Sequence, residues 1–305
     1  MARFAYVNGR YVLHDKATVH VEDRGYQFAD GVYEVVPVVG RSMIDEDPHL
    51  DRLGRSLDEL MIAMPVSRQV LKMIMRELVR RNRLVGGLVY MQITRGVAPR
   101  DHQFPAVAPP PALVMTTTAI DLAAQPKFRD GVKVITIPDI RWTRCDIKTV
   151  SLLPNCLGKQ QAAEAGAYEA WQVDRDGYVT EGTSSNAWIV TDAGKLLTRE
   201  LSIDILSGVT RRTIFAIAET EGLEYEERPF TVAEARSACE AFASSATSFV
   251  TPVVQVDDTM IGDGKPGPLA LKLLDWYLDY CAGGRRDKHV GPWTAGEIEP
   301  LREIA

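Results

Sequence analysis

Short strand-like runs outnumber helical segments in this sequence, and tight turns join several of them. Before residue 100 the strand-like runs are FAYVNGRYVL, YEVVPVV and the alternating GLVYMQITRG, with two helical segments before the third run. The helical segments repeat apolar residues with the period of one buried helix face, at Leu50, Leu53, Leu57, Leu60, Met61 and Met64, and at Val70, Leu71, Ile74, Leu78 and Val79. This order excludes a doubly wound sheet with one helix per strand and predicts an α+β fold.

A proline-rich break divides the chain. The segment FPAVAPPPA contains Pro109, Pro110 and Pro111, whose missing N–H groups exclude a helix interior or a central strand. The strand-like run LVMTTT and the polar segment AAQPKFRDG follow it. We therefore expect an N-terminal α/β domain over residues 1–120, a linker over 121–130, a C-terminal domain over 131–281 and a tail over 282–305.

The part after the break also alternates strands, turns and helices. Strand-like runs are VKVITIP, YEAWQVD and NAWIVT, and a helix is expected over residues 155–166. Another helix is expected to begin with Ser207 as its N-cap and to end at Gly222. A short helix, strands around SSATS and a last helix, PLALKLLDWYLDY, complete the chain.

The composition is that of a globular protein. Of the 305 residues 46% are hydrophobic and 25% charged, which excludes a wholly disordered chain. The net charge of −6 argues against a nucleic-acid binder. The four cysteines have no metal-site or disulfide spacing, no signal peptide is recognisable, and no apolar run is long enough to span a bilayer. These features predict a cytoplasmic protein.

Several common catalytic motifs are absent. The sequence has no GxGxxG, GxSxG or HExxH, and in IGDGKPGP the residue after the lysine is Pro266, where a phosphate loop needs Ser or Thr. The five histidines are scattered, so no metal site is expected. These absences argue against a Rossmann enzyme, a P-loop enzyme, a serine hydrolase of the elbow type and a zinc protease.

Three segments carry residues suited to chemistry. Lys148 lies among apolar residues, and partial loss of hydration favours a neutral, nucleophilic amine that can form a Schiff base. Glu181 precedes the hydroxyl-rich loop GTSSN, and Val209 and Thr210 open a helix whose N-terminus suits a phosphate. Taken singly, these residues equally fit a surface lysine, a hairpin loop and ordinary helix capping.

Together these segments resemble those of a known group of enzymes. EDRGYQFADGVYEVV, HLDRL, TRGVAPRDHQFP, RWTRCDIKTVSLLPN, EGTSSN and ILSGVTR occur in the order found in the fold-type IV pyridoxal-phosphate enzymes, most closely the D-amino-acid aminotransferases. The resemblance runs from about Phe4 to Asp279. It implies pyridoxal 5′-phosphate as cofactor and a two-domain fold, with a smaller N-terminal domain and a larger, barrel-like C-terminal domain.

The resemblance assigns roles to individual residues. Lys148 would hold the cofactor as a Schiff base and afterwards act as general base and acid. Glu181 would pair with the pyridine nitrogen and Arg52 with the phosphate. Further cofactor contacts are expected from Ser184, Ser185, Val209, Thr210, Ser245, Ala246 and Thr247. Ala246 stands where relatives commonly carry a threonine, so any phosphate contact there must come from its backbone N–H or from a neighbour.

The substrate class depends on the residues that bind the substrate carboxylate. Arg100 and His102 in PRDHQFP, with Tyr33, resemble the carboxylate-binding set of the D-amino-acid enzymes, in which the Arg and the His reach the neighbouring site of a homodimer. We therefore expect ping-pong transamination between D-amino acids such as D-alanine and 2-oxoglutarate or pyruvate, without nucleic-acid or membrane partners.

Other activities share this fold. The alternatives are a branched-chain L-amino-acid aminotransferase, an (R)-amine transaminase and, with less support, an aminodeoxychorismate lyase, which would not need the Arg–His pair. A cofactor-free binding protein is disfavoured by the presence of Lys148, Glu181 and Arg52 together.

Overall fold

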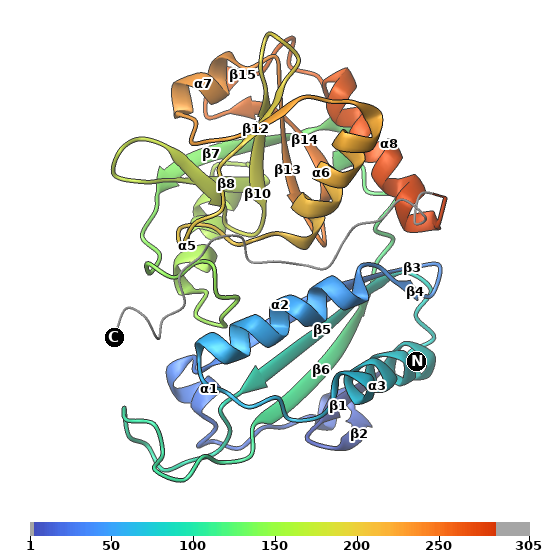
Figure 1. Ribbon diagram of the computed structural model, residues 1–305, viewed down its shortest axis with the longest axis vertical. Coiled ribbons are helices and arrows are strands. Elements are labelled where there is room, and N and C mark those ends of the chain that lie inside the picture. Colours follow the sequence, from blue (N-terminus) through green and yellow to red (C-terminus); the bar gives the residue numbers. More distant parts are fainter. Residues whose placement is uncertain (1–2, 285–305) are drawn as a thin grey trace.

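The computed structural model describes residues 3–284, which form two sheets with helices packed against them (Figure 1). The N-terminal sheet is antiparallel, in the order β2-β1-β6-β5-β3-β4. Its strands are β1 (Phe4–Val7), β2 (Arg10–Leu13), β3 (Gly31–Val39), β4 (Ser42–Met43), β5 (Gly87–Thr94) and β6 (Ala112–Ala119). A 3₁₀ turn, η1 (His14–Lys16), and the short helix α1 (Arg24–Phe28) lie between β2 and β3.

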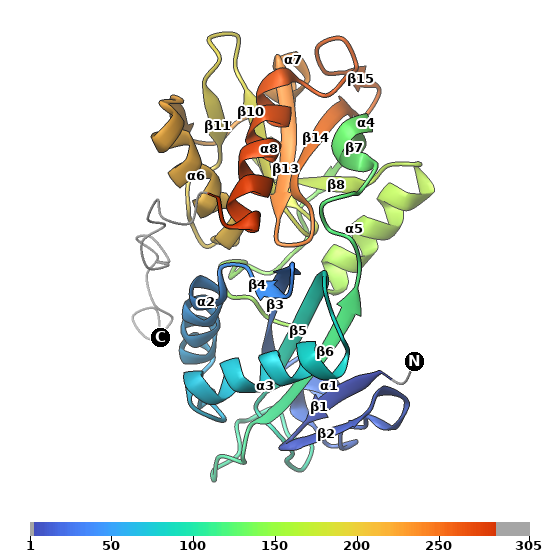
Figure 2. The same ribbon diagram turned by 90° about the vertical axis from the view of Figure 1, so that its right-hand side faces the viewer.

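Two longer helices pack on this sheet. Helix α2 (Glu46–Glu59) contacts β3, and α3 (Arg68–Arg81) contacts β1 and β6 (Figure 2). The leucines of α2 and four of the five expected apolar residues of α3 form one buried cluster with alternate residues of β5, which confirms the expected faces apart from Val70. Val70 is 38% exposed. The cluster members from these elements are Leu50, Leu53, Leu57, Leu71, Ile74, Leu78, Val79, Val89, Met91 and Ile93.

The expected first helix was too long. Helix α2 ends at Glu59, and Leu60 is its C-cap. Met61 has a left-handed backbone (φ 53°), which turns the chain out of the helix, and both Met61 and Met64 are exposed. The apolar spacing therefore continued by coincidence beyond the point where the helical backbone stops.

The C-terminal sheet has nine strands, and most of its strand pairs are antiparallel, in agreement with the expected α+β fold. Eight follow the order β12-β11-β10-β13-β14-β7-β8-β9, with β15 paired to β14. The pairs β11–β12, β14–β7 and β7–β8 are parallel and the other pairs antiparallel. The strands are β7 (Val132–Pro138), β8 (Glu169–Val173), β9 (Val179–Gly182), β10 (Asn186–Val190), β11 (Leu196–Thr198), β12 (Tyr225–Glu227), β13 (Glu240–Ser245), β14 (Phe249–Val256) and β15 (Thr259–Met260).

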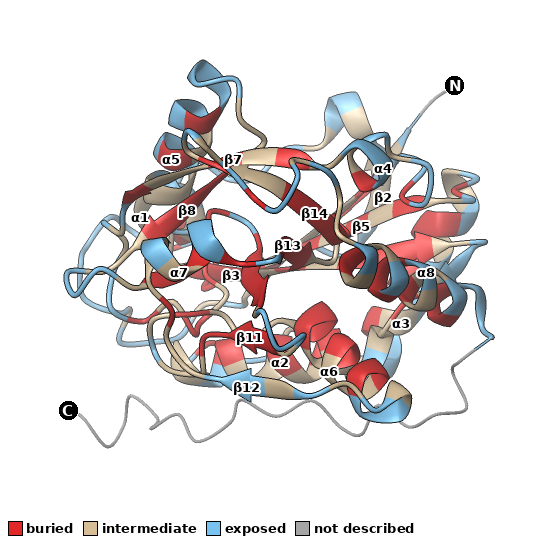
Figure 3. Cartoon of the chain, turned by 90° about the horizontal axis from the view of Figure 1, so that it is seen from above, coloured by how far each residue is buried: buried red, intermediate tan, exposed pale blue. Residues whose placement is uncertain are grey.

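Five helices of the described residues accompany this sheet: α4 (Lys127–Asp130), α5 (Leu153–Glu164), α6 (Val209–Glu221), α7 (Val232–Ser237) and α8 (Pro268–Ala282). Helices α6 and α8 contact each other and β13, and in Figure 3 their inner sides are buried while their outer sides are exposed. Of the expected tail over residues 282–305, residues 285–305 lie outside the described residues. Within residues 3–284, no helix combines the length and the apolar character needed to cross a bilayer.

The start of α6 differs from the sequence-based expectation. Its N-cap is Gly208, with no side-chain cap, whereas Ser207 was expected there; Gly222 ends the helix in a left-handed conformation as expected (φ 69°). A Cβ at position 208 would lie 2.1 Å from the side-chain oxygen of Asn186. Glycine is therefore required at this position by the close approach of Asn186 rather than by capping.

Ile44 connects the two halves of the molecule. It lies between β4 and α2 but is 1% exposed and belongs to the hydrophobic cluster of the C-terminal sheet. The next residue, Asp45, accepts hydrogen bonds from Thr213 of α6 (3.0 Å) and from the Tyr280 hydroxyl of α8. The two halves therefore share a core and a polar contact.

Replacing Ile44 with alanine tests this shared core. Ile44→Ala should lower the free energy of unfolding by about 3 kcal/mol, because the vacated volume lies in a packed cluster. The measurement is urea unfolding followed by tryptophan fluorescence. Ile140→Ala, at a residue 61% exposed, is the matched control and should change stability by less than about 0.5 kcal/mol. Equal effects of the two substitutions would contradict the role of Ile44.

Candidate active site

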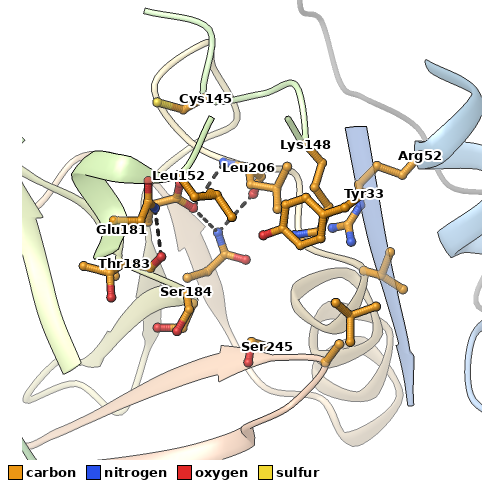
Figure 4. Close-up of a pocket in the computed structure, with 18 of the residues that line it drawn as sticks. Tyr33, Arg52, Cys145, Lys148, Leu152, Glu181, Thr183, Ser184, Leu206 and Ser245 are labelled. Carbon is orange, nitrogen blue, oxygen red and sulfur yellow. Dashed lines mark hydrogen bonds between the residues drawn. The ribbon is translucent and has the colours of Figure 1, made fainter. Parts of the chain in front are cut away.

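A cavity of about 210 Å³ lies where the two sheets meet (Figure 4). Its lining includes every expected cofactor residue together with Tyr33, and these residues come from both halves of the molecule. They are Tyr33, Arg52, Lys148, Glu181, Ser184, Ser185, Val209, Thr210, Ser245, Ala246 and Thr247. Residues more than 200 positions apart in the sequence thus surround one space.

Lys148 lies on the connection between β7 and α5, and its backbone is fixed against β3. Its N–H donates to the Ser56 hydroxyl (3.3 Å), and its carbonyl accepts from the Tyr33 N–H (3.0 Å). The amine nitrogen lies 4.2 Å from the centre of the Tyr33 ring, so the two side chains are neighbours in the pocket (Figure 4). The lysine is therefore held by its main chain while its amine faces the cavity.

Glu181 lies across the cavity from Lys148 (Figure 4). One carboxylate oxygen accepts from the Asn186 amide and the Leu206 N–H, both at 3.1 Å, and the other accepts from Arg141. Burial raises the pKa of Glu181, while Arg141 and the hydrogen-bond donors oppose that rise. A buried carboxylate of this kind gains from a further cationic donor in the cavity, which fits a protonated pyridine nitrogen.

Arg52 is a buried residue of α2 with partners from both halves. Its Nε and Nη2 donate to the two oxygens of Glu34 (2.7 and 2.9 Å), and its Nη1 donates to the Ser207 carbonyl (3.0 Å). His49 also bonds to Glu34 (2.8 Å). Of the five guanidinium N–H groups, two remain for an anion in the cavity.

Two further parts of the cavity lining contain backbone N–H groups: the first turn of α6 and the β13–β14 turn. The first N–H groups of α6, at Val209 and Thr210, have no side-chain cap, and such groups bind anions. In the β13–β14 turn, Ser245 accepts hydrogen bonds from the N–H groups of Thr247 (3.3 Å) and Ser248 (3.1 Å). The N–H groups of α6 together with Arg52 suit the phosphate of a cofactor, whereas the Thr247 and Ser248 N–H groups already donate within their own turn.

The hydroxyl-rich loop after β9 has a partner that the sequence did not indicate. Ser184 and Ser185 donate to buried Glu169 (2.8 and 3.1 Å), and Thr183 donates to the same carboxylate. The anion that this loop surrounds is therefore a side chain of β8. Ser184 and Ser185 still line the cavity, but their hydroxyl protons are already used.

Arg100 and His102 lie outside this cavity. They occupy the connection between β5 and β6, where the Arg100 guanidinium lies 4.7 Å from the Phe28 ring centre and the His102 ring 5.5 Å from it. The chain therefore does not bring these two residues to its own Lys148, although it does bring Tyr33 there.

Five residues around the site were not found by sequence reasoning: Glu34, His49, Arg141, Glu169 and Asn186. All except Arg141 are buried charged or polar side chains. Four of them lie within the motifs that carry the family resemblance, but no role was assigned to them there: Glu34 in EDRGYQFADGVYEVV, His49 in HLDRL, Arg141 in RWTRCDIKTVSLLPN and Asn186 in EGTSSN. Glu169 stands out in the sequence only as an acid within an apolar strand.

Neither a reactive thiol nor a metal site is found around the cavity in the described part of the chain. Burial raises the pKa of the Cys145 thiol, which also lines the cavity, to about 12, so the thiol stays protonated near neutral pH. Among residues 3–284, no three His, Cys, Asp or Glu side chains are placed to bind a metal ion.

The Glu34–Arg52 pair generates a stability prediction. Burial alone would raise the pKa of Glu34, but Arg52 and His49 hold it well below its ordinary value. Its contribution to stability is therefore present above the ordinary pKa of about 4.3 and is lost as the pH falls towards the depressed folded value. Glu34→Gln should lower the free energy of unfolding by about 3 kcal/mol between about pH 5 and 8, since it leaves Arg52 buried without a charged partner.

Urea unfolding at several pH values measures this difference, which should narrow below about pH 4. Glu77→Gln is the control, because Glu77 pairs with Arg80 and Arg81 on the solvent face of α3. It should leave stability nearly unchanged. A loss that is the same at pH 3 and pH 7 would contradict the assignment.

The comparisons with known proteins agree with this site. Residues 31–256 match the model of the amino-transferase class IV family. D-Alanine aminotransferase of Bacillus licheniformis is 42% identical over 262 residues, covering 86% of this chain and 91% of that protein. D-Alanine aminotransferase of Staphylococcus haemolyticus is 37% identical over 275 residues, covering 90% and 96% respectively.

Solved structures show the same architecture. A branched-chain amino acid aminotransferase of T.th. with pyridoxamine 5′-phosphate has a TM-score of 0.86 at 26% identity, covering 94% of this chain and 97% of that one. The branched-chain enzyme of Escherichia coli has a TM-score of 0.85 at 22% identity, covering 97% and 100%, which bears on the fold alone. The fold-type IV architecture and the pyridoxal-phosphate cofactor expected from the sequence are thereby confirmed. The chain belongs to the class IV aminotransferase family of pyridoxal-phosphate enzymes.

Proposed function

We propose that this protein transfers amino groups between D-amino acids such as D-alanine and 2-oxo acids such as 2-oxoglutarate or pyruvate, by a ping-pong mechanism. The observation that carries the proposal is one cavity with a lysine on one side, a buried carboxylate opposite, and anion-binding groups beside them. The similarity to proteins named D-alanine aminotransferase over about 90% of the chain supports the D-amino-acid class.

Lys148 is the proposed Schiff-base lysine and the group that moves the proton. Its amine faces the cavity beside Tyr33, which allows it to bind the cofactor. The same amine would later take the proton from the substrate Cα and deliver it to C4′ of the cofactor. When bound, the cofactor supplies a conjugated ring that accepts the electrons of the broken Cα–H bond. Glu181 would pair with the pyridine nitrogen and keep it protonated, while Arg141 donates to one oxygen of Glu181 and holds the carboxylate in place.

The phosphate is proposed to bind at the side of the cavity where α2 and α6 meet. Arg52 has two N–H groups left after its bonds to Glu34 and Ser207, and the uncapped N-terminus of α6 supplies further donors through Val209 and Thr210. Ser245, Ala246 and Thr247 line the same cavity. Because Ala246 has no hydroxyl, its contribution is limited to the backbone N–H of the turn. Ser184 and Ser185 form part of the cavity wall, where their hydrogen bonds to Glu169 hold them in place.

The substrate carboxylate is proposed to bind Tyr33 of one subunit together with Arg100 and His102 of the partner subunit. A homodimer is the arrangement that lets these two residues serve a cavity, since they do not line the cavity of their own chain. The connection that carries them also exposes Phe104 (51%) and Val107 (85%), apolar surface that a partner subunit would cover. We place the two-domain division at residues 121–130 and the protein in the cytoplasm, where its free cysteines would stay reduced.

The first test follows the visible absorption of the purified protein. The bound cofactor should give a yellow band that D-alanine bleaches, while L-leucine in a separate cuvette leaves it unchanged. Bleaching by L-leucine alone would favour the branched-chain alternative and contradict the role of Arg100 and His102. A protein that stays colourless after incubation with pyridoxal phosphate would contradict the enzymatic proposal altogether.

The second test replaces Arg100 with leucine. Loss of the cationic partner should raise the KM for D-alanine by about a hundredfold, the effect of losing one or two charge-assisted hydrogen bonds. The absorption band should stay intact, because Arg100 does not contact the cofactor. Arg175→Leu, at an exposed arginine in the turn between β8 and β9, is the matched control and should change nothing. An unchanged KM in Arg100→Leu would remove the carboxylate assignment.

A further inference from the structure

The β5–β6 connection that carries Arg100 and His102 has little regular structure of its own. Its backbone is nevertheless held by hydrogen bonds at the two residues after Arg100. Arg24 of α1 is 2% exposed and donates from Nη1 to the carbonyl of Asp101 (2.6 Å) and from Nη2 to the carbonyl of His102 (3.4 Å). One buried guanidinium thus holds the two residues that directly follow Arg100. A loop held in this way presents its side chains in a defined direction.

A second set of bonds fixes Arg24 itself. Its Nε donates to Asp30 (2.8 Å), and Asp30 also accepts two hydrogen bonds from Arg95 (2.8 and 3.0 Å). Arg95 donates in turn to the carbonyls of Leu60 and Met61 after α2, and its guanidinium lies 3.6 Å from the Phe104 ring centre. This network of three side chains therefore joins α1 to the end of α2 and to the β5–β6 connection. It contacts that connection at Asp101, His102 and Phe104. A buried network that is this well satisfied is rigid.

The side chains of the loop rest on the same short helix. The Phe28 ring has the Arg24 guanidinium 4.8 Å from its centre and the Arg100 guanidinium 4.7 Å from it, and the His102 ring is a third neighbour at 5.5 Å. Arg24 and Phe28 are the first and last residues of α1. Helix α1 is anchored in turn by Asp23, whose carboxylate accepts from the Gly25 N–H and from Thr94 of β5, both at 2.9 Å.

We propose that Arg24 is a positioning residue for recognition of the substrate carboxylate: it fixes the backbone of Asp101 and His102 so that Arg100 and His102 project together from the Phe28 ring. The inference rests on the proposed function, in which these two residues bind the carboxylate. Without Arg24 the loop would have to be ordered by the substrate, and that ordering would weaken binding. Lysine cannot replace it, because a single ammonium lacks the planar fork that reaches Asp30 and two carbonyls at once.

The test compares Arg24→Lys with Arg199→Lys in the holoenzyme. Arg199 is a matched control, since it is also buried and bonds a carboxylate, Asp174 (2.7 Å), but contacts no part of the loop. Four quantities are measured: KM and kcat for D-alanine, the inhibition constant of propionate as a carboxylate without an amino group, and amide hydrogen exchange of residues 99–105. Only the exchange is measured without turnover.

In Arg24→Lys, KM for D-alanine and the inhibition constant of propionate should both rise by about tenfold, the effect of about 1.4 kcal/mol, with kcat within about twofold of the native enzyme. Exchange in residues 99–105 should be faster, and Arg199→Lys should show none of these changes. Native-like KM, inhibition and exchange in Arg24→Lys would overturn the proposal.

Two further variants keep the outcomes separate. If Arg24→Lys fails to retain cofactor, Phe28→Leu tests the other half of the proposal, because leucine keeps the apolar volume but removes the ring beside Arg100 and His102. KM and the inhibition constant should then rise, while exchange of residues 99–105 stays native-like because Arg24 still holds the backbone. Native-like KM and inhibition in Phe28→Leu would overturn the proposal that the two side chains are presented from this ring. Arg100→Leu tests the proposed function alone. An unchanged KM there refutes the carboxylate site itself, whereas a raised KM there with a native-like Arg24→Lys refutes only the positioning role.

Discussion

The guanidinium of Arg52 is the interaction on which the cavity depends. It joins Glu34 of β3 to the Ser207 carbonyl just before α6, so a single buried side chain links the N-terminal sheet to the start of α6 in the C-terminal half. Because both ions are buried, each depends on the other for stabilisation of its charge. The pair therefore sets the distance between β3, which carries Tyr33, and the N-terminus of α6. A residue assigned to cofactor binding is thus also a structural tie between the two halves.

The fold was predictable because its signals are local. The periodic leucines of α2 and the alternation in β5 depend only on neighbouring residues, and both faces proved to be buried. The ends of elements were less predictable. Nothing in the apolar period showed that Met61 turns the chain out of α2. The N-cap of α6 is Gly208 rather than Ser207, and the need for glycine there comes from Asn186, a residue more than twenty positions away.

The candidate site was predictable to the extent that its residues occur in recognisable motifs. The motifs predicted cofactor roles for Lys148, Glu181 and Arg52, and the structure places these three residues around one cavity. The partners of these residues were not predictable. Arg141 behind Glu181, and Glu169 beneath the serines of the β9–β10 turn, have roles that arise only when separate strands and connections meet. Hydrogen bonds between distant segments leave no periodic trace in a sequence.

The connection between β7 and α5 supplies both Arg141, which supports Glu181, and Lys148 on the other side of the cavity. Arg141 is tied to Asp139 and to the Asp204 carbonyl, and the main chain of Lys148 is tied to Tyr33. Both ends of this short piece of backbone are therefore fixed by bonds to other segments. Between them Trp142 and Thr143 are exposed, but Arg144, Asp146 and Ile147 are buried. An inserted or deleted residue in the buried part would therefore displace Lys148 or break its neighbours' contacts, unlike a change in a surface loop. Change in chain length during evolution is accordingly expected to be rare in this connection, even where the side chains between Arg141 and Lys148 vary.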